Sequence, residues 1–197
     1  MMTNNIFIFD YGHGLDTPGK RSPDGKLQEA VYVREIGSEI ISRLTDFGIS
    51  THVLVPESYD VPLTTRVSRV NKLVKDNPGN QYFLISLHLN ASGSGSNWNK
   101  ANGWSVFVSP NASGTSKELA EVMTKNAEEQ RLKVRREYPN LGYWTQDLYI
   151  LKKSLCPAIL TENLFMDNKE DYNLLLSDRD KIVKLHVYGI LDFLRYE

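Results

Sequence analysis

Short apolar runs alternate regularly along this chain with segments of helical periodicity. Apolar, β-rich runs predict strands at residues 6–9, 52–55, 82–87, 104–108 and 157–161. Apolar residues at helical spacing predict helices at residues 29–47, 62–76, 116–131, 168–176 and 178–195. Strands that alternate with helices favour an α/β fold, with a twisted, mostly parallel sheet flanked by helices on both faces.

Length and composition fit one globular domain. The chain has 197 residues, and its content of 41% hydrophobic and 24% charged residues excludes intrinsic disorder. A chain of this length can bury roughly two thirds of the surface of its unfolded form, so it needs no disulfide to fold. No repeat or linker divides it, and we expect a single domain over residues 1–197.

Charge and hydropathy exclude several classes of partner. The 23 basic and 24 acidic residues give a formal net charge of −1, so we expect no nucleic acid partner and no membrane partner. No apolar run reaches the length of a membrane span. The first residues lack the basic region and apolar core of a signal peptide, so we expect synthesis in the cytoplasm. Cys156 is the single cysteine, and we expect an inert buried thiol.

Three polar residues, His13, His88 and Glu162, stand where apolar runs stop. Because the carboxyl ends of parallel strands meet at one edge of a sheet, we expect these side chains to share a crevice, with Glu29 on the same rim. Two histidines and a carboxylate are the ligand set of a catalytic zinc, and a second carboxylate can deprotonate the zinc-bound water. A single strand-end histidine is more often structural, so the prediction of a metal hydrolase depends on the combination.

Four segments together resemble one protein family. They are residues 9–14 (FDYGHG), Glu29 at a helix start, residues 85–91 (ISLHLNA) and residues 157–168 (PAILTENLFMDN). In this order and spacing they are similar to the motifs of the zinc-dependent N-acetylmuramoyl-L-alanine amidases of the type-3 class. These are peptidoglycan hydrolases of bacterial cell-division enzymes and phage endolysins. The resemblance covers about residues 6–194, essentially the whole chain.

The resemblance implies a zinc ion held by His13, Glu29 and His88, with Glu162 as the catalytic base. The implied reaction cleaves the amide between the lactyl group of N-acetylmuramic acid and L-alanine, using water whose pKa zinc lowers from about 15.7 toward 7. Two alternatives stay open: a zinc peptidase that cuts within the stem peptide, and a non-catalytic wall-binding module. Glu35 is an alternative to Glu29 as the carboxylate ligand, but the simpler interpretation of Glu35 is a solvent-exposed residue on the helix.

Asn90, Trp98 and Tyr143 are candidates for contact with the substrate. Asn90 could instead cap a loop, and Trp98 could instead pack on the body of the domain. Residues 91–102 are rich in Ser, Gly and Asn, and predict a mobile surface loop that borders the groove. Asp10 could accept a hydrogen bond from a metal-binding histidine, or be a plain turn residue.

The remaining polar candidates have structural interpretations. We expect Arg66 and Arg69 to anchor a helix to acidic neighbours, and His52 and His186 to be structural. The predicted partner is bacterial peptidoglycan, bound by a monomer without a separate wall-binding domain. The missing signal peptide suggests a phage or prophage lysis enzyme that a holin releases to the wall, or a domain cut from a longer protein.

Overall fold

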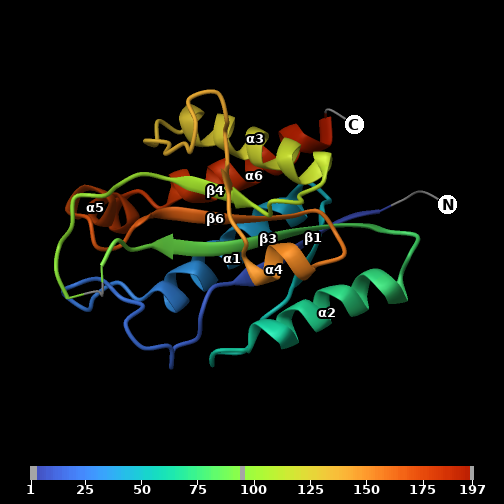
Figure 1. Cartoon of the computed structure of the whole chain (residues 1–197), viewed down its shortest axis with the longest axis horizontal. Coiled ribbons are helices and arrows are strands. Elements are labelled where there is room, and N and C mark those ends of the chain that lie inside the picture. Colours follow the sequence, from blue (N-terminus) through green and yellow to red (C-terminus); the bar gives the residue numbers. More distant parts are fainter. Residues whose placement is uncertain (1–3, 94–95, 196–197) are drawn as a thin grey trace.

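A six-stranded sheet forms the centre of the molecule in the computed structural model, which describes residues 4–93 and 96–195 (Figure 1). Its strands, in the order β2-β1-β3-β6-β4-β5, are β1 (Asn5–Tyr11), β2 (Ser50–Val53), β3 (Gln81–Asn90), β4 (Ser105–Val108), β5 (Trp144–Thr145) and β6 (Ala158–Phe165). The first four strands of that order run parallel, whereas β4 is antiparallel to β6 and β5 is parallel to β4. The sheet is therefore mostly parallel, as predicted.

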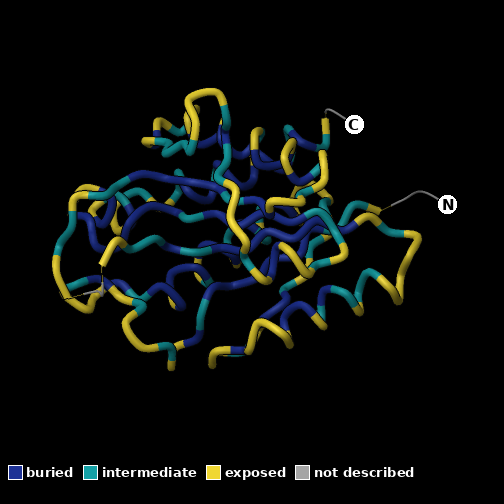
Figure 2. Tube along the Cα trace, viewed as in Figure 1, coloured by how far each residue is buried: buried dark blue, intermediate teal, exposed yellow. Residues whose placement is uncertain are grey.

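Helices cover both faces of the sheet (Figure 1). They are α1 (Glu29–Asp46), α2 (Leu63–Asp76), α3 (Gly114–Glu129), α4 (Tyr149–Lys153), α5 (Lys169–Ser177) and α6 (Asp180–Arg195). One hydrophobic core joins the sheet to α1, α3 and α6, and a second joins it to α2 and α4. Alternation along β1 divides its side chains between them, since Phe7 and Phe9 belong to the first core and Ile8 to the second. Figure 2 shows the buried backbone running along the central strands.

Local sequence signals begin and end the helices. Ser113 caps α3, because its hydroxyl oxygen accepts a hydrogen bond from the Ser116 N–H at 3.1 Å. Asn168 caps α5, with its side-chain oxygen accepting from two N–H groups of the first turn. Gly48 follows α1 with a left-handed φ of 73° and ends that helix. No helix in the described part of the chain combines the length and apolar character that crossing a bilayer requires.

Three strands, β1, β3 and β6, run past the apolar runs that predict them. β3 continues to Asn90 and β6 to Phe165, so His88 and Glu162 lie within strands and are paired in the register of the sheet. The expectation that these two residues follow the strand ends is therefore wrong in detail. Strand pairing depends on hydrogen bonds between backbone N–H and C=O groups, which do not depend on the type of side chain. The strands therefore continue where the side chains become polar.

The sequence predicts no strand or helix between the helix at residues 116–131 and the strand at residues 157–161, but this segment contains β5 and α4. β5 pairs with β4 at the edge of the sheet, and α4 begins at Tyr149. A two-residue strand and a five-residue helix are too short to produce a periodic pattern, so the sequence carries no signal for them. α4 packs with α2 over the second core.

His186 ties α6 to the sheet from a fully buried position. Its Nδ1 lies 2.8 Å from the Ile182 carbonyl oxygen, and its Nε2 lies 3.1 Å from the Thr161 hydroxyl. Since a carbonyl oxygen only accepts, Nδ1 carries the hydrogen and Nε2 accepts from Thr161, so the ring is neutral. Burial lowers the pKa of His186 to about 4. The structural role predicted for this residue is confirmed.

We expect His186 to make the stability of the domain depend on pH. Its pKa is lower in the folded state than in the unfolded state, so the unfolded chain binds more protons between those two values. The free energy of unfolding should therefore fall as the pH drops from about 6.5 toward 4, and His186 should account for about 2 kcal/mol of that loss by about pH 5. Urea unfolding at about pH 7 and about pH 5 checks this, since His186→Gln should lose less stability than the wild type. An equal loss in both proteins would refute the assignment.

Candidate active site

Three candidate metal ligands meet at the carboxyl end of the central strands. His13 follows β1, Glu29 is the first residue of α1, and His88 lies near the end of β3. One possible ligand atom from each lies within 4.8 Å of the other two. His88 Nδ1 is 3.1 Å from Glu29 Oε1, and His13 Nε2 is 3.7 Å from Glu29 Oε2. The structure thus brings together the three residues that the sequence analysis groups as ligands.

The Glu29 carboxylate is fully buried but only partly satisfied. Its Oε1 accepts a hydrogen bond from the Leu89 N–H at 3.0 Å and contacts His88. Its Oε2 has no hydrogen-bond partner among the residues that the structure describes. Burial works to raise the pKa of Glu29, but the hydrogen bond and charge of His88 and the charge of His13 lower it overall. A buried carboxylate oxygen without a donor suits a bound cation, so these residues fit a divalent metal.

The backbone before His13 is shaped by close contact with β3. Gly12 donates its N–H to the Leu87 carbonyl oxygen at 3.0 Å, and a Cβ atom added at Gly12 would lie 2.6 Å from the His88 ring. Only glycine fits at that position. His13 adopts a left-handed φ of 57°, and Arg34 donates to its carbonyl oxygen at 3.1 Å. This tight turn places the His13 side chain at the cluster.

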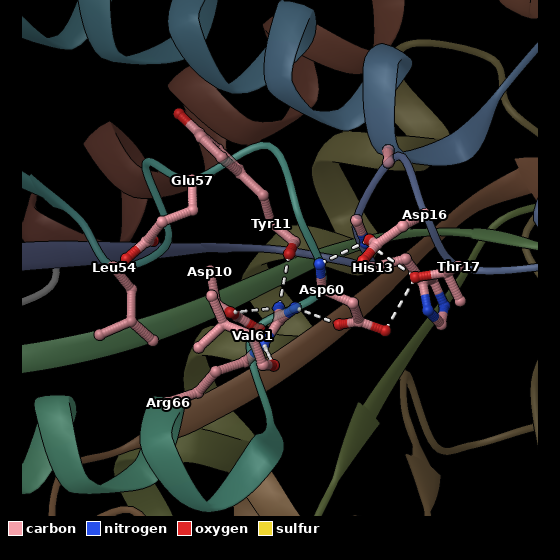
Figure 3. Close-up of polar contacts among 12 residues, drawn as sticks. Asp10, Tyr11, His13, Asp16, Thr17, Leu54, Glu57, Asp60, Val61 and Arg66 are labelled. Atoms are coloured by element: carbon pink, nitrogen blue, oxygen red, sulfur yellow. Dashed lines mark hydrogen bonds and ion pairs between the residues drawn. The ribbon is translucent and has the colours of Figure 1, made fainter.

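A buried arginine on α2 braces the end of β1 (Figure 3). The Arg66 guanidinium donates to Asp10 Oδ1 at 2.8 Å and to the Tyr11 carbonyl oxygen at 2.5 Å. It also donates to Asp60 Oδ1 at 3.0 Å, and the second oxygen of Asp60 accepts from the Thr17 hydroxyl at 2.8 Å. Arg66 thereby fastens α2, the end of β1 and the following loop to one another. Its predicted role as a helix anchor is confirmed.

Asp10 does not accept a hydrogen bond from a histidine within the described residues, so that expectation is wrong. One of its carboxylate oxygens accepts from Arg66, and the other accepts from the Ser86 hydroxyl at 2.6 Å. Ser86 stands beside Asp10 in the register of β1 and β3. Asp10 therefore affects the site through Arg66 and the strand pairing, and not through direct contact with a ligand.

Glu162 lies on β6 beside His88 of β3. Its Oε2 is buried and has no hydrogen-bond partner in the part of the chain that the structure describes. Burial raises the pKa of Glu162 to about 7, although the nearby charge of His88 works to lower it. A carboxyl group with a pKa close to neutrality can accept a proton and give it back, which a general base and acid must do.

Two cavities open on the histidine pair. The first, the polar cavity, measures about 470 Å³ and is lined by the three candidate ligands together with Lys20, Asn90 and Glu162, among others. The second, the apolar cavity, measures about 450 Å³ and is lined by His13 and His88 together with Val61, Leu63, Tyr149 and Ile150, among others. Because both histidines line both cavities, a long substrate can cross the ligand cluster from one cavity to the other.

The described part of the loop at residues 91–102 is held in place by Asp167. Asp167 is fully buried, and its Oδ2 accepts four hydrogen bonds, from Ser92 N–H at 2.9 Å, Ser92 Oγ at 3.4 Å, Gly93 N–H at 3.0 Å and Asn99 Nδ2 at 2.8 Å. Gly93 lines the polar cavity, so the loop borders the groove as expected. The prediction of a mobile loop did not take the hydrogen bonds to Asp167 into account. Residues 94–95 of the loop lie outside the described residues.

The three predicted substrate contacts lie in different places. Asn90 lines the polar cavity, and its Oδ1 also accepts from the next N–H along the chain at 2.9 Å. Trp98 packs on α5, with its ring centroid 5.1 Å from that of Tyr172 and 3.5 Å from Lys169 Nζ. Tyr143 packs against the core beneath α1, α3 and α6. Trp98 and Tyr143 are not among the residues that line the two cavities.

The other predicted assignments agree with the structure. Glu35 forms an exposed ion pair with Arg179 at 3.1 Å and is a solvated helix residue. Arg69 anchors α2 through an ion pair with Glu57. Burial raises the pKa of the Cys156 thiol to about 12, which keeps the thiol protonated and inert.

Sequence reasoning missed two residues near the site: Lys20, which lines the polar cavity, and Asp167, which holds the loop beside that cavity. Asp167 carries a usable signal, because an acidic residue directly after an apolar strand must find donors when it is buried. Lys20 stands in a loop with Pro18 and Gly19, where no periodic pattern shows which way a side chain points. Its place in the cavity lining becomes visible only in the folded chain.

The α/β sheet carries a His–Glu–His cluster and a further carboxylate at its carboxyl edge. This arrangement is typical of metal-dependent hydrolases. The chain belongs to the N-acetylmuramoyl-L-alanine amidase family, whose sequence model matches residues 6–192. The resemblance seen in the sequence motifs is thereby confirmed.

The chain is also similar to curated proteins named as an amidase and an endolysin. The N-acetylmuramoyl-L-alanine amidase CwlM of Bacillus licheniformis is 30% identical over 189 residues, which are 94% of this chain and 66% of the relative. The endolysin of Bacillus phage SPP1 is 26% identical over 195 residues, which are 97% of this chain and 66% of the relative. The chain thus spans about two thirds of the length of these curated relatives.

Solved structures of amidases share the fold. The N-acetylmuramyl-L-alanine amidase from Mycobacterium smegmatis superposes with a TM-score of 0.83 at 18% identity, and 99% of each chain is covered. The N-acetylmuramoyl-L-alanine amidase from Clostridium difficile superposes with a TM-score of 0.80 at 23% identity, covering 98% of this chain and 97% of that one. The fold described above is therefore shared with known amidase structures.

Removing the Asp167 carboxylate should loosen the loop beside the polar cavity. Asp167→Ala leaves four donors without their acceptor, which should cost about 1–3 kcal/mol of stability. Amide hydrogen exchange at Ser92 and Gly93 should become faster, and the melting temperature should fall. Asp147→Ala is the matched control, because Asp147 forms only an exposed ion pair. Unchanged exchange at Ser92 and Gly93 in Asp167→Ala would contradict the anchoring role.

Proposed function

We propose that this chain is a zinc-dependent amidase that cleaves the bond between the lactyl group of N-acetylmuramic acid and L-alanine in peptidoglycan. One observation carries the proposal: the His13, Glu29 and His88 cluster lies beside Glu162, and one buried carboxylate oxygen each of Glu29 and Glu162 has no hydrogen-bond partner among the described residues. Two imidazoles and one carboxylate are a donor set that zinc accepts while keeping a position open.

The residues around the cluster supply the proton transfers of an amide hydrolysis. A zinc ion bound by the three ligands supplies a Lewis acid, which makes water more acidic and polarises the scissile carbonyl. Glu162 takes the proton from the attacking water, for which a pKa of about 7 suits it. Glu162 then donates that proton to the nitrogen of L-alanine as the C–N bond breaks. Asn90 lines the same cavity and offers an amide N–H to a carbonyl of the substrate.

Two other activities are less well supported. A zinc peptidase that cuts within the stem peptide could use the same site, but membership of the amidase family favours the bond to L-alanine. A wall-binding module without catalysis has no use for a buried carboxyl oxygen that has no hydrogen-bond partner among the described residues, as Glu162 Oε2 is. An endolysin and a bacterial amidase are among the relatives, which supports action on the cell wall. A monomeric state and release by a holin stay predictions.

Replacing Glu162 should separate metal binding from catalysis. Glu162→Gln keeps the shape of the side chain and loses its basicity, so turnover should fall by roughly 10² or more while zinc content stays near normal. Digested peptidoglycan, examined by mass spectrometry, should yield free stem peptides with an L-alanine amino terminus from the wild type. Glu118→Gln on the exposed face of α3 is the control and should digest like the wild type.

Three other results would change the assignment. Stems cut internally but still attached to sugar would identify a peptidase. Undiminished turnover in Glu162→Gln would remove Glu162 from the reaction. Loss of zinc from Glu162→Gln would make Glu162 a ligand.

A further inference from the structure

The two cavities give the substrate a direction. Glu162 lines the polar cavity and is not among the residues that line the apolar cavity. In the proposed function Glu162 protonates the departing nitrogen, and a proton donor must lie within hydrogen-bond reach of the atom it protonates. The leaving stem peptide therefore extends into the polar cavity, and the acyl side extends away from it.

Lys20 is a cation that lines this polar cavity. Its side chain is half-buried and lines the cavity together with Glu162 and Asn90. Its carbonyl oxygen accepts from the Glu29 N–H at 3.0 Å, which fixes the Lys20 backbone beside the ligand cluster. Among the described residues, Lys20 Nζ has neither a hydrogen bond nor an ion pair.

Two neighbouring arginines differ from Lys20 in this respect. Arg34 donates to the carbonyl oxygens of His13 and Glu57, and Arg66 is held by Asp10 and Asp60. The guanidinium groups of Arg34 and Arg66 are therefore engaged in hydrogen bonds and ion pairs within the fold. The Lys20 ammonium remains available to a ligand, and its positive charge reaches both Glu162 and His13, whose pKa values it works to lower.

We propose that Lys20 binds a carboxylate of the leaving stem peptide and makes the enzyme prefer stems whose carboxyl groups are free over stems whose carboxyl groups are amidated. The proposal rests on the proposed function, since it needs the peptide to occupy the polar cavity. An ammonium group in a partly buried cavity forms a strong, charge-assisted hydrogen bond with a carboxylate. It gains much less from a carboxamide, which carries no charge. Sugar hydroxyls are neutral too, so the peptide is the part of the substrate that this charge can select.

The test compares kcat/KM on two preparations of glycan–peptide fragments, one with free stem carboxyl groups and one with those groups converted to carboxamides. The wild type should prefer the free form by about tenfold or more, the scale expected of one charge-assisted hydrogen bond. Lys20→Met should bring that ratio close to one, Lys20→Arg should keep the preference, and Lys20→Glu should invert it. Lys26→Met is the matched control from the same loop and should keep the wild-type ratio, because Lys26 is exposed and does not line the polar cavity.

The outcomes separate this proposal from the proposed function. If the wild type releases L-alanine amino termini from neither preparation, the proposed function itself fails. If the wild type cleaves both preparations equally well, or if Lys20→Met keeps the preference, the role of Lys20 is overturned while the amidase activity stands. Zinc content and melting temperature, measured on every variant, show whether a change in the ratio comes from the side chain or from damage to the site. Should Lys20→Met fail to fold, Lys20→Arg and Lys20→Glu decide the matter by the sign of their preference.

Discussion

The buried carboxylate of Glu29 is the constraint on which the rest of the site depends. Removing an ionised carboxylate from water costs several kcal/mol unless positive charge and hydrogen-bond donors replace the solvent. His88 and the Leu89 N–H replace the solvent around Glu29 Oε1. Glu29 Oε2 has no hydrogen-bond partner among the described residues, and a cation bound together with His13 would neutralise it. The close packing at Gly12 serves the same cluster. It lets the chain after β1 approach β3 closely enough for both histidines to reach the Glu29 carboxylate.

The parallel sheet converts this local constraint into an active site. β1, β3 and β6 all present their carboxyl ends at one edge, so a ligand after β1, a ligand on β3 and a general base on β6 lie side by side. Arg66 keeps the first of these in place by joining α2 to the end of β1. Glu162 Oε2 has no hydrogen-bond partner in the described part of the chain, and burial raises the pKa of Glu162 to about 7, which suits proton exchange near neutral pH.

The ligand cluster could be predicted because its residues interrupt strong local patterns. His13 and His88 stand near the ends of apolar runs, and Glu29 opens a helix of clear periodicity. What could not be predicted depends on contacts between distant segments, such as the antiparallel course of β4 beside β6 and the packing of Trp98 on α5. The role of Asp10 was misjudged for the same reason, since strand pairing supplies its partner from β3. Periodicity reports which face of an element is buried and says nothing of which partner it meets.

In the proposed function, His13, Glu29 and His88 together hold one metal ion. Elemental analysis of purified protein tests it most directly, with His52→Ala as control because His52 lies on β2 outside the cluster. We predict about one zinc per chain in the wild type and in His52→Ala, and little or none in His88→Ala, since loss of one ligand from a three-ligand site removes most of its affinity. Undiminished zinc in His88→Ala would contradict the account, as would a wild type that hydrolyses peptidoglycan at full rate after its metal has been removed.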